Sequence, residues 1–154
     1  MPFEPPIIQL CPVTADLVPK LLDLRLRPDQ VRMVASVNDS LEEAETDEDA
    51  RPRAILHDGE PVGFLMYDAT SAGDVAQLYR FIIDEWQQGK GFGRAALSAV
   101  IAEIRREPHV SKISICYEPE NMAARQLYLS AGFVEQGLDE DGEMIAHLAL
   151  PPSS

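Results

Sequence analysis

A short glycine-rich segment, Gln88 to Gly93, has the composition of a phosphate-binding turn. Three of its six residues are glycine, so the backbone there can approach an anion without interference from Cβ atoms. The segment lies between an apolar run, Leu78 to Ile83, and an amphipathic stretch, Arg94 to Arg105, which predicts a strand, a turn and a helix. The free N–H groups and the dipole of a helix start favour negative charge. The pattern therefore predicts a pyrophosphate site, and the alternative is a turn that only eases helix packing.

A second motif with chemical potential begins at Asn121 and runs to Phe133. Asn121 can cap the helix that follows it, contact a ligand, or do both with different atoms of its amide. Arg125 can reach an anion or simply solvate the helix. The phenol of Tyr128 can donate a proton as a general acid, or its ring can fill the core. Gly132 is expected to end the helix in the left-handed conformation.

The elements that must position these motifs are predicted from hydrophobic periodicity and turn residues. A strand at 7–12 and a helix at 16–24, capped by Thr14, come first, and Pro28 then begins a helix that fades near Asn38. A hairpin with strands at 53–56 and 62–67 follows, and then a long strand at 75–84. Beyond the glycine turn we expect a helix at 94–105, a strand at 112–117, a helix at 121–131, and strands at 133–135 and 143–150.

The composition favours a single globular domain. The chain has 154 residues, of which 45% are hydrophobic and 25% charged, so we expect one core over residues 1–150 and a disordered tail at 151–154. No apolar stretch approaches the roughly 20 residues of a bilayer span and no signal-peptide pattern occurs, which predicts a cytoplasmic protein. Cys11 and Cys116 match no metal spacing, so reduced, packed thiols are expected. The three histidines are too scattered to form a ligand set, and no metal is expected.

The charge of the chain restricts its partners. A net charge of −13 disfavours nucleic acid and anionic membranes, because both repel such a surface. A cationic substrate would be attracted, although acidity can also serve solubility alone. Six of the eight residues from Glu42 to Asp49 are acidic, which is typical of a helix end or loop that can draw in polyamines.

Taken together, the two motifs resemble those of the GNAT superfamily of acetyl-CoA-dependent N-acetyltransferases. The resemblance covers roughly 53–150 and rests on Gln-x-x-Gly-x-Gly between strand and helix, followed after one strand by Asn-x-x-Ala-x-x-Leu-Tyr-x-x-x-Gly-Phe. Within the superfamily the chain looks most like bacterial spermine/spermidine acetyltransferases, chiefly through scaffold residues at 52–55, 61–67, 80–84 and 88–96. The resemblance implies an α/β fold of the α+β type, with a mixed, mostly antiparallel sheet of six to seven strands flanked by about four helices.

The resemblance also implies where acetyl-CoA binds. The backbone of Phe81, Ile82 and Ile83 would pair with the pantetheine amides, and Asn121 would contact the same arm. Lys90, Arg94 or Arg125 would add contacts to the phosphates. The residues that would surround the pyrophosphate lie in the turn and at the helix start: Gln88, Gly89, Lys90, Gly91, Phe92, Gly93, Arg94 and Ala95. Tyr128 would protonate the departing CoA thiolate.

One position departs from the family pattern. Several GNAT enzymes carry a glutamate on the central strand as general base, whereas this chain has the segment Gln77-Leu78-Tyr79-Arg80 there. An alkylamine with a pKa near 10 must lose a proton before it attacks. Glu45 or Glu118 acting through water, or Tyr79 itself, are the remaining candidates for the base.

The sequence therefore predicts direct transfer of an acetyl group from acetyl-CoA to a primary amine, with a polyamine as a candidate acceptor. No covalent acyl-enzyme is required, because no nucleophile paired with histidine is evident. Two alternatives stay open: a non-catalytic module that binds acetyl-CoA as a sensor, and an acetyltransferase acting on protein N-termini. A homodimer is expected by family analogy alone.

Overall fold

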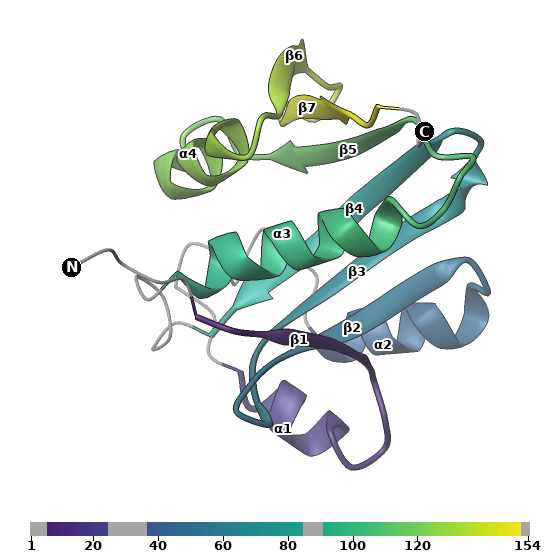
Figure 1. Ribbon diagram of the computed structural model, residues 1–154, viewed down its shortest axis with the longest axis vertical. Helices are drawn as coiled ribbons and strands as arrows, with labels where there is room; N and C mark the ends of the chain where they lie inside the picture. Colours follow the sequence, from purple (N-terminus) through teal and green to yellow (C-terminus); the bar gives the residue numbers. More distant parts are fainter. Residues whose placement is uncertain (1–5, 25–36, 85–90, 152–154) are drawn as a thin grey trace.

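The computed structural model describes residues 6–24, 37–84 and 91–151. The helices and strands in these ranges follow the chain in this order (Figure 1): β1 (Gln9–Pro12), α1 (Val18–Leu22), α2 (Val37–Thr46), β2 (Ala50–His57), β3 (Glu60–Ala72), β4 (Val75–Ile83), α3 (Phe92–Ile104), β5 (Lys112–Tyr117), α4 (Met122–Ser130), β6 (Val134–Leu138) and β7 (Met144–Ala149). Within these ranges, every helix is too short or too polar to span a bilayer.

All seven described strands form one sheet, in the order β1-β2-β3-β4-β5-β7-β6. Neighbouring strands are antiparallel except for β4 and β5, which are parallel. The α3 crossover between β4 and β5 makes this parallel pair possible, because parallel neighbours cannot be joined by a tight hairpin. The predicted mixed, mostly antiparallel sheet with flanking helices is confirmed.

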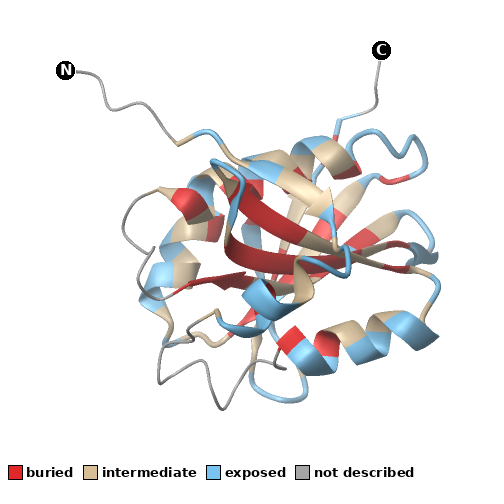
Figure 2. Cartoon of the chain, turned by 90° about the horizontal axis from the view of Figure 1, so that it is seen from below, coloured by how far each residue is buried: buried red, intermediate tan, exposed pale blue. Residues whose placement is uncertain are grey.

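The two faces of the sheet carry separate hydrophobic clusters. One cluster joins α3 and α4 to the sheet and includes Leu97, Val100 and Tyr128. The other cluster joins α1 and α2 to the opposite face, through Leu21 and Val37. Because strand residues alternate between faces, the central strands are buried on both sides, as Figure 2 shows by their colour.

Strand β4 contains a β-bulge at Tyr79. Leu78 pairs with Tyr67 and Arg80 pairs with Met66, so Tyr79 is an extra residue with no partner of its own on β3. A bulge of this kind bends the strand and increases its local twist. It lies two residues beyond Gln77, the last residue of β4 that pairs with β5.

The bulge changes which face of the sheet the next residues occupy. Tyr79 packs against the cluster under α1 and α2, and Arg80 also reaches that side, where it donates to the Ser40 hydroxyl at 3.1 Å and to Glu43 at 2.9 Å. Two consecutive side chains therefore share one face. Phe81 then lies on the opposite face, packed against the cluster that contains α4.

The predicted elements are largely present, with corrections in the first third. The helix predicted from Pro28 falls mainly on residues outside the described ranges, but α2 does not fade near Asn38: it runs to Thr46 and takes in the start of the acidic run. Thr14 does not cap α1, because the N-cap is Leu17 without a side-chain bond, while the Thr14 hydroxyl donates to Asp16.

Two predictions about single residues in the C-terminal half have different outcomes. Gly132 follows α4 with a φ of +102°, as the predicted left-handed position requires. Both cysteines are free, but Cys116 is exposed, so the prediction of packed thiols is wrong for this residue. The reason is strand alternation: Ile115 and Tyr117 of β5 face the core, and Cys116 between them faces away.

Candidate active site

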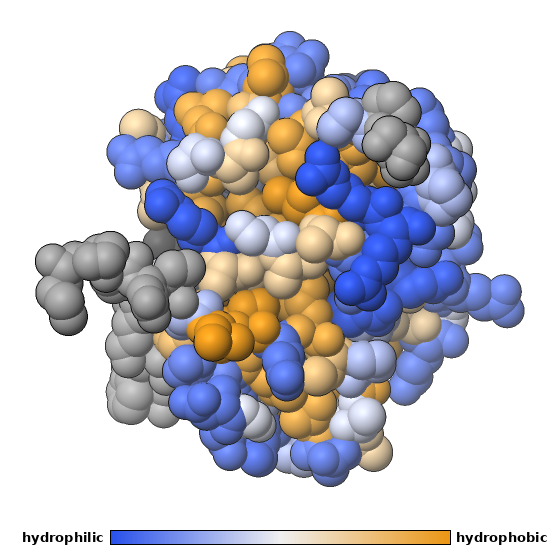
Figure 3. Space-filling view, in the orientation of Figure 1, coloured by the Kyte–Doolittle hydropathy of each residue, from blue (hydrophilic) through white to orange (hydrophobic). Residues whose placement is uncertain are grey.

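Strands β4 and β5 pair at one end only. Their parallel ladder covers Val75–Gln77 and Lys112–Ser114. Beyond it, β4 continues to Ile83 and β5 to Tyr117 without pairing to each other, and the two strands diverge in Figure 1. Hydrophobic side chains gather on the surface between α3 and the layer of α4 and β5 (Figure 3). The fold thus provides an opening whose β4 edge carries backbone groups that β5 does not pair.

The predicted pantetheine-binding residues lie on this divergent part of β4. Phe81, Ile82 and Ile83 pair with residues 63–65 of β3 along their other edge. Ile82 is fully buried on the α1 and α2 side of the sheet, whereas Phe81 is partly exposed on the side of α4. The structure therefore brings these residues to the opening.

Helix α3 begins beside the opening. A Cβ added to Gly93 would lie 3.9 Å from the Ile83 side chain and 3.6 Å from that of Leu127 in α4. The N-cap residue, Gly91, has a φ of +87°, a conformation that costs most other residues energy, and no side chain caps the helix. The first amides of such a helix have no intrahelical acceptor and are available to an anion.

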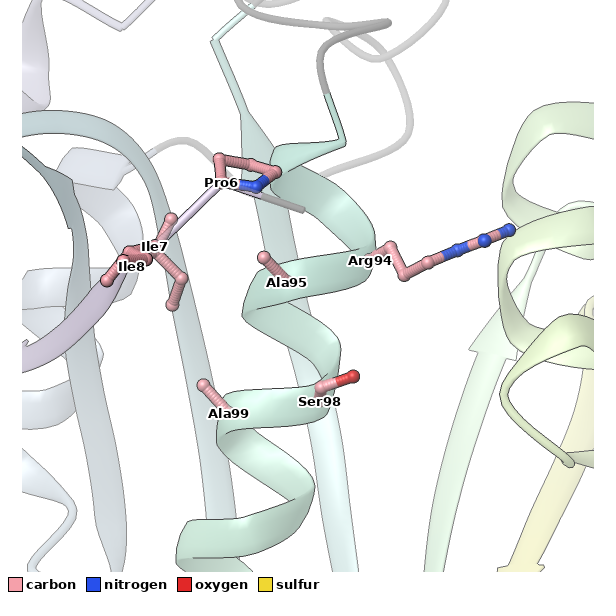
Figure 4. Close-up of a pocket in the computed structure, with 7 residues that line it drawn as sticks. All are labelled: Pro6, Ile7, Ile8, Arg94, Ala95, Ser98 and Ala99. Atoms are coloured by element: carbon pink, nitrogen blue, oxygen red, sulfur yellow. The ribbon is translucent and has the colours of Figure 1, made fainter. Parts of the chain in front are cut away.

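The other residues of the predicted pyrophosphate site are only partly described. Gln88, Gly89 and Lys90 lie outside the described residues. The Ala95 amide donates to the Gly91 carbonyl oxygen at 3.1 Å, so it is used by the helix and does not fit the predicted phosphate contact. Arg94 is exposed, and its side chain extends from α3 toward α4 in Figure 4.

A cavity of about 370 Å³ lies between α3 and the segment before β1. Figure 4 shows Ile7 and Ile8 on one side of α3, next to Ala95 and Ala99, while Arg94 extends on the other side. No lining residue of this cavity belongs to β4, β5 or α4. It is therefore distinct from the opening between the strands.

Helix α4 carries the second predicted motif to the same region. Asn121 is its N-cap, and the side-chain oxygen of Asn121 accepts from the Ala124 amide at 3.2 Å. The capping interpretation is thus confirmed, and the side-chain NH2 group is not consumed by it. Contact with a ligand stays a prediction.

Tyr128 is surrounded by three aromatic rings. Its centroid lies 5.4 Å from Tyr117 in a stacked arrangement, 6.4 Å from Phe81 and 5.8 Å from Phe133 in edge-to-face arrangements. The residue is 8% exposed, and no hydrogen bond joins its hydroxyl group to another described residue. Burial, with a smaller contribution from Tyr117, raises the pKa of the Tyr128 phenol, so the group stays protonated at neutral pH and is able to donate a proton.

A hydrogen-bonded network lies behind Tyr128. The Tyr117 hydroxyl donates to Glu135 Oε2 at 2.6 Å, and Arg125 donates to Glu135 Oε1 at 2.9 Å. Arg125 is therefore engaged within the protein, and the predicted contact with phosphate stays untested. Tyr117 and Glu135 were not predicted from the sequence. The available signal was weak: Tyr117 is the last inward-facing residue of its strand, and only the pairing of β6 with β7 brings Glu135 near.

The candidates for the general base lie in different places. Tyr79 has a buried hydroxyl with no hydrogen-bond partner in the described ranges, and burial, with added repulsion from Glu43, raises its pKa to about 12. It therefore holds its proton at neutral pH, which argues against a role as base. Glu45 is exposed on α2, and Glu118 follows β5. Partial burial and the nearby carboxylates of Asp139 and Glu118 raise the pKa of Glu143.

One group of possible metal ligands occurs among the described residues. Cys116, Asp139 and Glu143 each offer a ligand atom, all within 4.8 Å of one another. Asp139 Oδ1 already accepts from the backbone amides of Asp141 and Glu143, both at 2.9 Å. These bonds explain the position of Asp139 through closure of the β6–β7 turn.

Comparison with known proteins identifies the family of this chain. The model of the acetyltransferase (GNAT) family matches residues 18–133. The spermine/spermidine N(1)-acetyltransferase of Bacillus subtilis (strain 168) is 32% identical over 145 residues, which cover 90% of this chain and 95% of that protein. The chain belongs to the GNAT acetyltransferase family. It is an acetyl-CoA-dependent N-acetyltransferase.

Solved structures agree with the GNAT fold. An acetyltransferase from Thermus thermophilus has a TM-score of 0.76 and 23% identity, and the match covers 93% of this chain and 97% of that one. The PaiA N-acetyltransferase of Thermoplasma acidophilum, solved in complex with coenzyme A, has a TM-score of 0.73 and 12% identity, with coverage of 94% and 99%. At these identities the likeness establishes the fold.

Proposed function

We propose that this GNAT enzyme acetylates a primary amine of the polyamine class, with acetyl-CoA bound in the opening between β4 and β5. The observation that carries the acceptor class is the 32% identity to a spermine/spermidine N(1)-acetyltransferase over 90% of the chain. The net charge of −13 supports it, because a polycation is drawn to such a surface.

Part of the acidic run on and after α2 can supply this attraction. Glu43 is paired with Arg80 at 2.9 Å, and Asp49 accepts from the hydroxyls of Thr70 and Ser71. These two carboxylates are therefore already engaged in contacts within the protein. The carboxylates of Glu45 and Glu48 are exposed and add to the field that a cationic acceptor meets, together with others on the same segment.

The co-substrate would lie along β4 with its phosphates at the start of α3. Residues 81–83 would offer backbone groups to the pantetheine amides, as an added strand does. The amides of Phe92, Gly93 and Arg94 and the Arg94 guanidinium would face the pyrophosphate. The Asn121 side-chain NH2 group, left over from the capping bond, would contact the pantetheine arm.

The transfer itself needs one acid and one base. The amine nitrogen attacks the acetyl carbonyl carbon, and the carbon–sulfur bond breaks as the new carbon–nitrogen bond forms. The Tyr128 hydroxyl donates its proton to the departing sulfur, which leaves as the thiol. Before the attack, the acceptor's ammonium group loses one proton through water to a carboxylate, with Glu45 or Glu118 as the candidates. The second proton leaves the nitrogen as the amide forms and restores the Tyr128 phenol.

The direct test measures release of the CoA thiol with a panel of amines. Spermine, spermidine, putrescine, lysine and a peptide with a free N-terminus would be compared at equal concentration and ionic strength. We expect the largest kcat/KM with spermine or spermidine, and a decrease with added salt because the attraction is electrostatic. Preference for the peptide or lysine would refute the polyamine assignment while leaving acetyl transfer in place.

A further inference from the structure

We propose that Tyr117, Glu135 and Arg125 form a positioning network that holds the Tyr128 ring in the orientation needed for proton transfer. The proposal rests on the role of Tyr128 proposed above. None of the three residues is assigned contact with the reacting atoms. Their contribution is the position of the phenol.

Tyr128 cannot hold this position through its own polar group. Its hydroxyl has no hydrogen-bond partner among the described residues, and within these residues the ring is held by packing against three aromatic side chains. Two of its three aromatic neighbours, Phe81 and Phe133, meet it edge to face. Of these three aromatic neighbours, Tyr117 is the one that lies against its face, with an angle of 29° between the rings.

Tyr117 is the neighbour that is itself tied in place. It is 6% exposed, and its hydroxyl donates to Glu135 at 2.6 Å. A phenylalanine at either edge has no comparable anchor. The Tyr117 ring, against which Tyr128 stacks, is therefore held in place by its burial and by the hydrogen bond of its own hydroxyl.

The contacts form a closed loop that returns to the helix of Tyr128. Glu135 of β6 accepts from Tyr117 of β5 with one oxygen and from Arg125 of α4 with the other. Arg125 lies one turn before Tyr128 on the same helix. The loop thus fixes the separation of α4 from β5, and with it the distance of the phenol from the opening.

The protonation states of Glu135 and Tyr117 determine which group donates and which accepts in these hydrogen bonds. The bonds from Tyr117 and Arg125 lower the pKa of Glu135, so it is ionised and accepts. Burial and the bond to Glu135 raise the pKa of Tyr117, so it remains a donor. Hydrogen bonds to a charged acceptor are short and strong, which suits a positioning role. A misplacement of about 1 Å at a catalytic group can cost on the order of 100-fold in rate.

The test is a series of variants at the network, measured with the best amine of the panel. Tyr117→Phe keeps the ring and loses the bond to Glu135, so kcat should fall about 3–10-fold; Tyr117→Leu loses the stack as well and should fall about 30–100-fold. Glu135→Gln still offers an oxygen to Tyr117 and should retain more activity than Glu135→Ala. The KM for acetyl-CoA should change less than about 3-fold throughout, because none of these side chains is assigned contact with the co-substrate. Glu107→Gln, an exposed glutamate after α3, is the matched control.

A double-mutant cycle separates positioning from general damage. If the network acts through the Tyr128 phenol, then Tyr117→Leu should cost less than about 2-fold in kcat when Tyr128→Phe is already present. Costs that multiply in the double variant would overturn the proposal. An equal loss in acetyl-CoA affinity would overturn it as well.

A crystal structure of Tyr117→Leu provides a readout that does not depend on turnover. We expect the Tyr128 ring to rotate or to adopt more than one conformer, and an unchanged ring would refute the network. If the wild-type protein acetylated none of the amines, the proposed function would fail, and this structure would still decide whether Tyr117 orients the ring.

Discussion

Gly63 of β3 and Ile82 of β4 lie so close together that a Cβ at position 63 would be 2.4 Å from the Ile82 carbonyl oxygen. The clash is with backbone, so β4 itself would have to move in Gly63→Ala. We expect a loss of about 1–3 kcal/mol in the free energy of unfolding, measured by urea denaturation. Because residues 81–83 border the opening, acetyl-CoA affinity should fall too. Unchanged stability and affinity would show that β4 is not constrained here.

The start of α3 can be tested with a pair of glycine variants. Gly91 at the helix start and Gly73 in the β3–β4 turn both have positive φ, +87° and +68°. Alanine at either should cost about 1–2 kcal/mol of stability, because the left-handed conformation is strained. Only Gly91→Ala should weaken acetyl-CoA binding, by roughly 10-fold in calorimetric titration, since of the two glycines only Gly91 lies at the helix start that we propose binds the phosphates. Equal effects on binding would remove the pyrophosphate assignment.

Removal of the Tyr128 hydroxyl should affect chemistry more than binding. In Tyr128→Phe the ring packing against Tyr117 and Phe133 is retained, so the fold and the KM for acetyl-CoA should persist. General-acid catalysis contributes about 10²–10⁴-fold, and kcat should fall by about that factor. Steady-state kinetics at saturating amine would measure it. Turnover equal to that of the wild type would exclude the phenol as the acid.

Two tyrosines on neighbouring strands should respond to the same change with opposite signs. The Tyr67 hydroxyl donates to Glu103, which also accepts from Arg53 Nε at 3.1 Å, whereas the buried Tyr79 hydroxyl has no partner in the described ranges. Tyr67→Phe should lose about 1.5–3 kcal/mol, and Tyr79→Phe should gain about 1 kcal/mol. Urea denaturation at pH 7 would measure both. Destabilisation by Tyr79→Phe would mean that its hydroxyl has a partner.

The stability of the protein should fall above about pH 10. The pKa of Tyr79 is raised from about 10 to about 12, so between these values the unfolded chain has lost a proton that the folded chain retains. Stability therefore decreases as pH rises through this window, and the raised pKa values of Tyr67, Tyr117 and Tyr128 act in the same direction. Melting temperatures from about pH 8 to about pH 11 should show a shallower decline for Tyr79→Phe. Parallel curves would contradict the shift.

Local patterns were sufficient to predict much of the fold. Strand β5 begins and ends where alternation and flanking residues indicated, and α4 follows its Asn121 cap and stops before Gly132. These elements depend on short-range rules of capping and periodicity. The end of α2 was misjudged because Glu42 to Thr46 has little apolar period of its own, and its helix is held by tertiary contacts such as Glu43 with Arg80.

The sequence predicted those residues of the candidate site whose type and place in a motif indicate a role. Asn121 and Tyr128 could be singled out from the motif, and the structure brings both to the opening region. The Tyr117 and Glu135 pair depends on the register of three strands, β5, β7 and β6, which no local pattern encodes. For the same reason the bond between Arg125 and Glu135 was not predicted, and the choice between an anion contact and solvation of the helix was left open for Arg125.

The extra residue in the middle of β4 has a consequence for the whole enzyme. If Tyr79 were deleted, the strand would alternate without interruption, and every other side chain now facing the core would still do so. The bend that the bulge gives to β4 would be lost, and the ladder that now stops after Gln77 could continue and close the gap. The space for a thioester between the two strands would thus depend on the presence of one extra residue in β4, whatever the side chain of that residue.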